Sequence, residues 1–270
     1  MQYLGVNYQI KHIPTLDPEF IPFGIWADAY RKDAKVPVAI AVERNDGYIS
    51  VRNTFIHGTE EKYEADCYYI DRLVKTELWM KGGFKVYVND SEIYEYLKSV
   101  YCAEGDRAFD WDFMSDVFEQ PFEVVLTDKI PETLDKPVSM GGHLDGCRIG
   151  FDAGGSDRKV SAVVDGETVY SEEVVWFPKI TADPDYHYDG IVSALKTAAS
   201  HMPRVDAVGV SSAGVYINNR TMRASLFLQV PKELNHKVKD IYIRAITDTF
   251  GDVPYSVIND GDVSALAGTM

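Results

Sequence analysis

The sequence predicts an α/β protein in which a lobe with a mixed sheet follows a smaller α/β domain. Apolar runs of strand length alternate with segments of helical periodicity, and the second half reads strand, strand, strand, helix, strand, helix, strand, helix. A chain of 270 residues is long enough for two cores. We place the domains at residues 1–140 and 147–270, because the proline- and glycine-containing stretch 128–146 is typical of a linker.

The elements of the first domain are bounded by turn residues. Residues 1 to about 35 contain Pro14, Pro18 and Pro22 and are expected to be irregular. Residues 106–119 are acidic and aromatic, and their rings are expected in a core or an interface. Strands are predicted at 38–43, 48–55, 84–88 and 122–126. Helices are predicted at 64–80 and 91–101.

The second domain is expected to begin with a hairpin. Its first strand ends at Phe151, and the alternating run 160–165 returns from a turn that holds Asp152 and two glycines. The later elements are predicted as strands at 168–175, 206–211 and 255–258, and as helices at 183–200, at 232–250 and from Asp262 onward.

Charge and composition limit the partners of the protein. A net charge of -15 argues against nucleic acid and disfavours an anionic membrane surface, since both require clustered lysine and arginine. No apolar run approaches membrane-spanning length, and the start lacks the pattern of a signal peptide. Cys67, Cys102 and Cys147 are widely spaced, so neither a disulfide framework nor a zinc site is indicated. We therefore expect a cytoplasmic protein.

Polar residues and glycines follow three strands of the second domain. Asp152 follows the first of these strands, Ser212 and Gly214 follow the fourth, and Asp260 follows the fifth. Ligands in α/β sheets collect at the carboxyl ends of strands, so one rim is expected to gather these residues. A turn with an aspartate and bare N–H groups suits phosphate and its metal ion, although an ordinary glycine-containing hairpin is the open alternative.

This order of elements resembles the first lobe of the actin-like ATPase superfamily, a ribonuclease H-like fold found in sugar kinases and actin. The runs at 149–156 and 257–268 resemble the ROK family of bacterial sugar kinases and sugar-responsive repressors. The corresponding runs of that family have the forms I-G-x-D-x-G-G-T-K and N-D-A-N-x-A-A-L-x-E. The match covers roughly 147–270, and no winged-helix DNA-binding front is visible in 1–140, which disfavours the repressor branch.

The resemblance implies that the protein binds ATP, Mg²⁺ and a sugar-like small molecule. By the first motif, Asp152 would hold Mg²⁺ through water. Gly154, Gly155 and Ser156 would approach the nucleotide phosphates. These residue types fit, because phosphoryl transfer depends mainly on positioning and on neutralising charge.

By the second motif, Asn259 would hydrogen-bond a sugar hydroxyl. Asp260 would accept the proton of that hydroxyl as it attacks the γ-phosphate. The alternative for Asp260 is an N-cap of the helix at Asp262. Ser212 and Gly214 are expected near the substrate, with a plain turn after the strand as the alternative.

The sequence departs from the family pattern at several positions. Ser156 replaces threonine, and the run Asp157-Arg158-Lys159 shifts the basic residue that follows the turn. Asp262 replaces asparagine and adds a carboxylate that would hinder a base at Asp260 if the two lay close together. The resemblance also places the adenosine pocket in a second lobe beyond this helix. We therefore expect a fragment that binds ATP weakly and does not turn over sugar.

Two classes of function remain, and either is compatible with a homo-oligomer. One is an ATP-dependent sugar or small-hydroxyl kinase of the ROK type, and the other is a non-catalytic actin-like protein that uses the same cleft for sugar sensing or assembly. A glycine-rich second phosphate loop in a longer gene product would favour the kinase. His143 and His187 have no partner at ligand spacing and are expected to be solvated loop residues.

Overall fold

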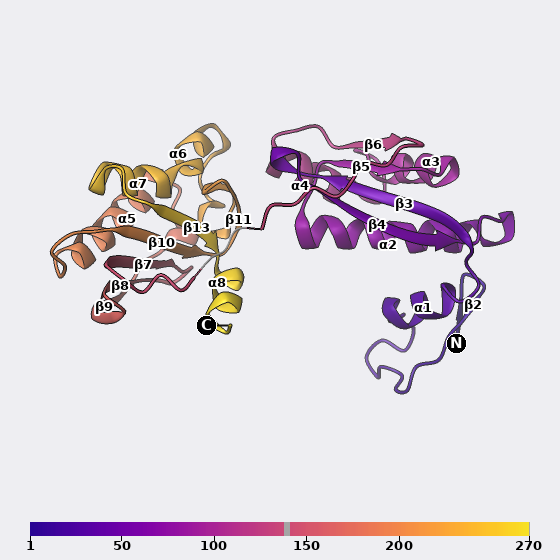
Figure 1. The fold of residues 1–270 in the computed structure, drawn as a ribbon, viewed down its shortest axis with the longest axis horizontal. Coiled ribbons are helices and arrows are strands. Elements are labelled where there is room, and N and C mark those ends of the chain that lie inside the picture. Colours follow the sequence, from indigo (N-terminus) through magenta and orange to yellow (C-terminus); the bar gives the residue numbers. More distant parts are fainter. Residues whose placement is uncertain (138–140, 270) are drawn as a thin grey trace. The chain divides into compact units, whose positions relative to one another are not determined.

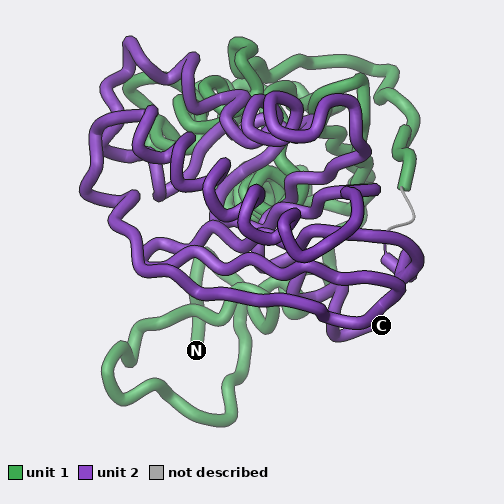
Figure 2. The backbone as a smooth tube through the Cα atoms, turned by 90° about the vertical axis from the view of Figure 1, so that its left-hand side faces the viewer, with its two compact units in different colours: residues 1–137 green, residues 138–270 purple. Residues whose placement is uncertain are grey.

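The protein consists of two compact units, residues 1–137 and 138–270, which Figure 2 colours separately. The structure is a computed structural model that describes residues 1–137 and 141–269. Residues 138–140, inside the predicted linker, and Met270 lie outside the described residues. The boundary between the units falls within the stretch 128–146.

The first unit is built on a four-stranded sheet in the order β4-β3-β5-β6, with only the β5–β6 pair parallel. A short hairpin, β1 (Gln2–Tyr3) and β2 (Val6–Asn7), precedes it. The strands of the sheet are β3 (Val36–Glu43), β4 (Ile49–Ile56), β5 (Lys85–Val88) and β6 (Glu123–Leu126). The helices are α1 (Phe23–Tyr30), α2 (Tyr63–Lys81), α3 (Ser91–Val100) and α4 (Ala108–Phe118).

Helices α1 and α4 lie where no helix was expected. Trp26 and Tyr30 of α1 are buried and stack with their ring centroids 5.1 Å apart, so burial of aromatic surface stabilises a short helix in a proline-punctuated region. In α4 the carboxylate of Asp110 is buried and accepts hydrogen bonds from Lys75 Nζ and Trp79 Nε1. Tertiary contacts therefore decide both helices, which explains why local sequence pattern did not predict them.

The second unit is built on a five-stranded sheet in the order β13-β10-β7-β8-β9. The central strand β7 pairs with β10 in parallel and with β8 antiparallel, and β13 pairs with β10 in parallel. The strands of this sheet are β7 (Cys147–Ala153), β8 (Asp157–Val164), β9 (Glu167–Val175), β10 (Ala207–Ser212) and β13 (Tyr255–Asn259). The other elements are the helices α5 (Pro184–Ala199), α6 (Asn235–Lys239), α7 (Ile241–Phe250) and α8 (Asp260–Ala267), and the hairpin β11 (Val215–Ile217) and β12 (Arg220–Arg223).

Helices α5 and α7 cover one face of this sheet (Figure 1). Alternate residues of β7, such as Ile149 and Phe151, point to that face and pack with Ile191 and Leu195 of α5 and Ile246 of α7. The residues between them point to the opposite face, as the period of two in a strand requires. The predicted α/β fold class with a mixed sheet is thus confirmed.

Three local features of this unit differ from expectation. The predicted helix 232–250 is interrupted at Asp240, where φ is -106° and ψ is 21°, and Arg220 Nε pairs with the Asp240 carboxylate at 2.8 Å. The hairpin of β11 and β12 was not predicted. Helix α8 begins at Asp260 rather than Asp262. Among the described residues, no helix combines the length and apolar character that crossing a membrane requires.

Candidate phosphate-binding site

The candidate site lies at the carboxyl ends of β7, β10 and β13. The sheet register places Asp152 of β7 directly beside Ser211 of β10, and Ser211 directly beside Ile258 of β13. Asn259 ends β13 and Asp260 begins α8. Three strand ends therefore meet at one edge of the sheet, on the rim where the sequence predicted them.

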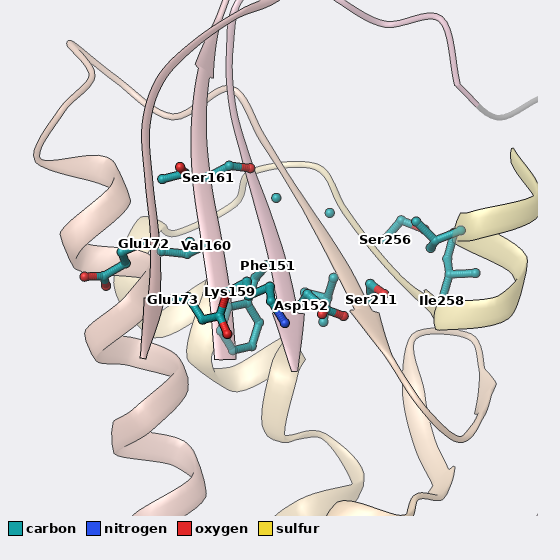
Figure 3. Close-up of a pocket in the computed structure, with 15 residues that line it drawn as sticks. Phe151, Asp152, Lys159, Val160, Ser161, Glu172, Glu173, Ser211, Ser256 and Ile258 are labelled. Atoms are coloured by element: carbon teal, nitrogen blue, oxygen red, sulfur yellow. The ribbon is translucent and has the colours of Figure 1, made fainter. Parts of the chain in front are cut away.

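Beside this edge is a pocket of about 650 Å³ on the sheet face that α5 and α7 leave open. Figure 3 shows Asp152 next to Ser211 and places Lys159 and Glu173 on the neighbouring strands. These four residues and Ile258 form one row across the sheet. On the same face of the sheet, the next row toward the amino ends of β7, β10 and β13 contains only small residues, namely Ser171, Ser161, Gly150, Gly209 and Ser256. Without large side chains in this row, a ligand can approach the backbone closely.

The turn between β7 and β8 is Gly154–Ser156, and Trp176 holds it at both ends. Trp176 Nε1 donates to the carbonyl of Gly154 at 2.8 Å, and the backbone N–H of Trp176 donates to the carbonyl of Ser156 at 3.1 Å. A Cβ on Gly154 would lie 2.6 Å from the carbonyl oxygen of Asp157, so this tight turn requires glycine. The turn is therefore ordered before any ligand binds.

The first residue of β8, Asp157, interacts with the turn rather than with the pocket. Its carboxylate accepts hydrogen bonds from Lys159 Nζ at 2.5 Å and from Ser156 Oγ at 3.0 Å. The Lys159 hydrogen bond, followed by that of Ser156, lowers the pKa of Asp157. The basic residue that the sequence shifts to position 159 is thus already paired with a carboxylate.

Asn259 has a structural role that its sequence position did not reveal. Its Oδ1 accepts from the N–H of Gly261 at 2.8 Å and caps α8, while its Nδ2 donates to the carbonyl of Gly214 at 2.8 Å. The cap that was considered for Asp260 is therefore Asn259. Since an amide side chain has two N–H donors and two acceptor lone pairs, one donor and one lone pair remain for a ligand.

Ser212 lies on the wrong face of the sheet for the substrate contact that was expected of it. It is fully buried, its Oγ donates to the carbonyl of Ala153 at 3.2 Å, and the hydroxyl of Tyr242 donates to it at 3.2 Å. The preceding residue, Ser211, faces the pocket instead. Gly214 does not line the pocket. A Cβ there would lie 2.5 Å from the carbonyl oxygen of Arg223, so close packing of β12 against this turn requires glycine.

Asp260 is exposed at the first position of α8, where its Oδ1 accepts from the N–H of Gly261 at 2.9 Å. Tyr216 is within its electrostatic reach. Burial, with a smaller contribution from the charge of Asp260, raises the pKa of Tyr216 to about 12. Among the residues that the structure describes, the Asp260 carboxylate forms no ion pair.

The residues present fit Mg²⁺ better than a tightly caged metal. Within residues 1–137 and 141–269, no group of three or more His, Cys, Asp or Glu side chains is arranged to hold a metal ion. Mg²⁺ usually keeps several waters and is held by one or two carboxylates together with substrate phosphates. Asp152 lies beside the glycine turn and lines the pocket, so it would be a carboxylate of this kind.

His187 is not a solvated loop residue, contrary to expectation. It lies in α5, is fully buried, and contacts the ring of Trp176 edge-on. Burial lowers its pKa, although its hydrogen bond with the carbonyl of Thr181 and the charge of Asp183 partly oppose this effect. The hydrophobic stripe of α5 includes position 187, so helical periodicity was the signal available in the sequence. His143, in contrast, is exposed.

The buried imidazole predicts acid sensitivity of the second unit. Because the pKa of His187 is lower in the folded than in the unfolded state, the unfolded chain binds the additional proton more readily, and stability should fall as pH decreases below about 6.5. The loss should approach about 1.4 kcal/mol for each pH unit by which folding lowers the pKa. The decrease in Tm between pH 7 and pH 5 should be smaller in His187→Gln than in the parent chain. An equal decrease in both chains would contradict this prediction.

No family model and no curated protein matches the chain. Among solved structures, a Listeria monocytogenes protein described as a candidate N-acetylmannosamine kinase is similar over 46% of this chain, at 22% identity and a TM-score of 0.31, and the chain spans only 38% of that protein. The Ppx/GppA enzyme of Aquifex aeolicus is similar over 86% of this chain and 96% of its own, at 10% identity and a TM-score of 0.28. RuvC of T. thermophilus is similar over 44% of this chain and 68% of its own, at 17% identity and a TM-score of 0.28. Similarities at these scores do not indicate a function.

Proposed function

We propose that the second unit is the phosphate-handling lobe of an ATP-dependent phosphotransferase of the ROK type, with a sugar or another small hydroxyl compound as acceptor. The observation that carries the proposal is the meeting of Asp152, its glycine turn and Asp260 at one edge of the sheet. The first motif brings a carboxylate and backbone donors. The second brings the carboxylate of Asp260, which forms no ion pair within residues 1–137 and 141–269. Phosphoryl transfer requires both kinds of group.

Each residue has a separate role in this proposal. Asp152 would orient Mg²⁺, and the backbone of Gly154 and Gly155 would hold phosphate oxygens, for which the ordered turn is preorganised. Bound Mg²⁺ would neutralise charge on the transferring phosphoryl group. Asn259 would hydrogen-bond the acceptor with its remaining donor or lone pair, and Asp260 would take the proton of the attacking hydroxyl.

Binding of inorganic tripolyphosphate to the 270-residue chain tests the phosphate part of this proposal. We expect amide resonances of residues 154–156 to shift in NMR spectra when tripolyphosphate is added, and to shift further with Mg²⁺. Asp152→Asn should remove most of the Mg²⁺-dependent component, because asparagine lacks the charge that holds the metal ion.

Asp165→Asn is the matched control, since Asp165 accepts the N–H of Gly146 at the opposite end of β8 and asparagine keeps that acceptor. It should bind like the parent chain. The proposal fails if tripolyphosphate shifts no resonance at the turn, or if Asp152→Asn and Asp165→Asn respond alike. Binding without phosphoryl transfer, when the lobe is joined to the second lobe that the resemblance implies, would favour the sugar-sensing or assembly alternative.

A further inference from the structure

The connection between β9 and α5 crosses the glycine turn and carries a lysine. Lys179 lies in a 3₁₀ turn at Pro178–Ile180, three residues after Trp176. Its side chain lies directly against Gly155, because a Cβ on that glycine would be 2.2 Å from Lys179 Cε and 2.5 Å from Nζ. Gly155 leaves room for the ammonium group at this place, and a larger residue there would displace it.

The connection holds Lys179 in a fixed relation to the turn. Besides the two hydrogen bonds from Trp176 to Gly154 and Ser156, the backbone N–H of Phe177 donates to the hydroxyl of Tyr186 at 3.0 Å. The hydroxyl of Thr181 closes the same turn by donating to the carbonyl of Phe177 at 2.6 Å. The backbone of the lysine is thus anchored on both sides, although its side chain is exposed.

The two basic residues that follow the turn, Lys159 and Arg158, already contact other groups. Lys159 pairs with Asp157 at 2.5 Å. Arg158 lies over the ring of Trp176 at 5.8 Å, on the helical face where Gly190 of α5 leaves space for its guanidinium. Within residues 1–137 and 141–269, the side chain of Lys179 forms no ion pair and no hydrogen bond.

From this arrangement we infer that Lys179 is the cation that binds a polyphosphate chain at the glycine turn. The inference rests on the proposed function. In the ROK-like motif a lysine follows the glycine turn, and here Lys179 would supply that positive charge from another segment. In a protein of net charge -15, with Asp152 and Asp157 flanking the turn, the carboxylates repel a phosphate chain, and a cation beside the turn would offset this repulsion. Lysine suits this task as a point charge with three donors.

Titration of four chains with tripolyphosphate, ATP and ADP at low ionic strength, followed by NMR, tests the inference. The chains are the parent, Lys179→Met, Lys179→Arg and the control Lys196→Met. Lys196 is an exposed lysine of α5, so its replacement matches the loss of net charge. Low ionic strength avoids screening of an exposed charge.

We expect Lys179→Met to weaken tripolyphosphate and ATP binding at the turn by about ten- to a hundredfold, the range expected for a lost charge-assisted hydrogen bond. Lys179→Arg should retain most of the affinity, and Lys196→Met should bind like the parent. A weaker effect with ADP than with ATP would place Lys179 at the terminal phosphate, and equal effects would place it at an inner one.

The outcomes separate this inference from the proposed function. If the parent binds at the turn and Lys179→Met binds equally well, Lys179 is not the phosphate cation while the phosphate site remains. If Lys196→Met loses as much affinity as Lys179→Met, only net charge matters and the assignment is overturned. If the parent shows no shifts at residues 154–156, both fail. Unchanged amide spectra outside the turn show that each variant is folded.

Discussion

Replacement of Asp260 by asparagine should lower phosphoryl-transfer turnover by about two to four orders of magnitude, the usual contribution of a positioned general base. Asparagine keeps the shape of the side chain but cannot accept the proton. Helix α8 should remain intact, because its cap is Asn259 and not Asp260. The measurement is kcat in a protein that joins these residues to the second lobe that the resemblance implies.

Two further variants make the result interpretable. Asp262→Asn removes a neighbouring carboxylate in the first turn of the same helix and should leave turnover nearly unchanged. Asp152→Asn should instead weaken the Mg²⁺-dependent part of nucleotide binding, since the lost carboxylate is directed at the metal ion. Near-normal turnover in Asp260→Asn on the true acceptor would remove Asp260 from the mechanism.

Phe151→Ala should destabilise the second unit by about 3–5 kcal/mol, the range for removing a large aromatic side chain from a core. Phe151 is 2% exposed, adjoins Asp152 in the sequence and packs beneath α5 and α7. Hydrogen exchange of peptides from residues 147–269, measured by mass spectrometry, should report the loss.

The matched control is Phe177→Ala, because Phe177 is 59% exposed in the same unit. It should change stability by less than about 0.5 kcal/mol. A similar loss of protection in both variants would mean that the apolar face of β7 does not form the core described above.

Regular elements of the fold could be predicted because their sequence pattern and their tertiary contacts agree. Strand β7 alternates residues such as Ile149 and Phe151 with Gly150 and Asp152, and the structure buries the first pair and leaves the second pair on the open face. Helix α1 was not predicted because its stability comes from the burial of Trp26 against residues distant in sequence. The indole of Trp26 also donates a hydrogen bond to the carbonyl of Tyr3.

The sequence predicted which strand ends form the site, but not which side chains at those ends face the pocket. Strand β10 ends with two neighbouring serines, and the sequence does not tell which of them faces the ligand. The sheet register places Ser211 in the pocket, whereas Ser212 lies in the core and donates a hydrogen bond to the carbonyl of Ala153. The double contact of Asn259 and the position of Lys179 against Gly155 also depend on segments distant in sequence. Neither leaves a local signal.

The strand order also links ligand binding to folding of the whole unit. Strands β7, β8 and β9 pair with their neighbours in sequence, whereas β7 meets β10 only across a long connection, as in the hydrogen bond from Cys147 N–H to Asp206, 59 residues away. Loop closure costs about 0.6 kcal/mol for each doubling of loop length, so the local hairpins are entropically cheaper to form than the parallel pairs. A ligand that spans the ends of β7, β10 and β13 can bind only after the parallel pairs have formed. Its binding free energy therefore adds to the stability of the complete sheet and not to that of the hairpins alone.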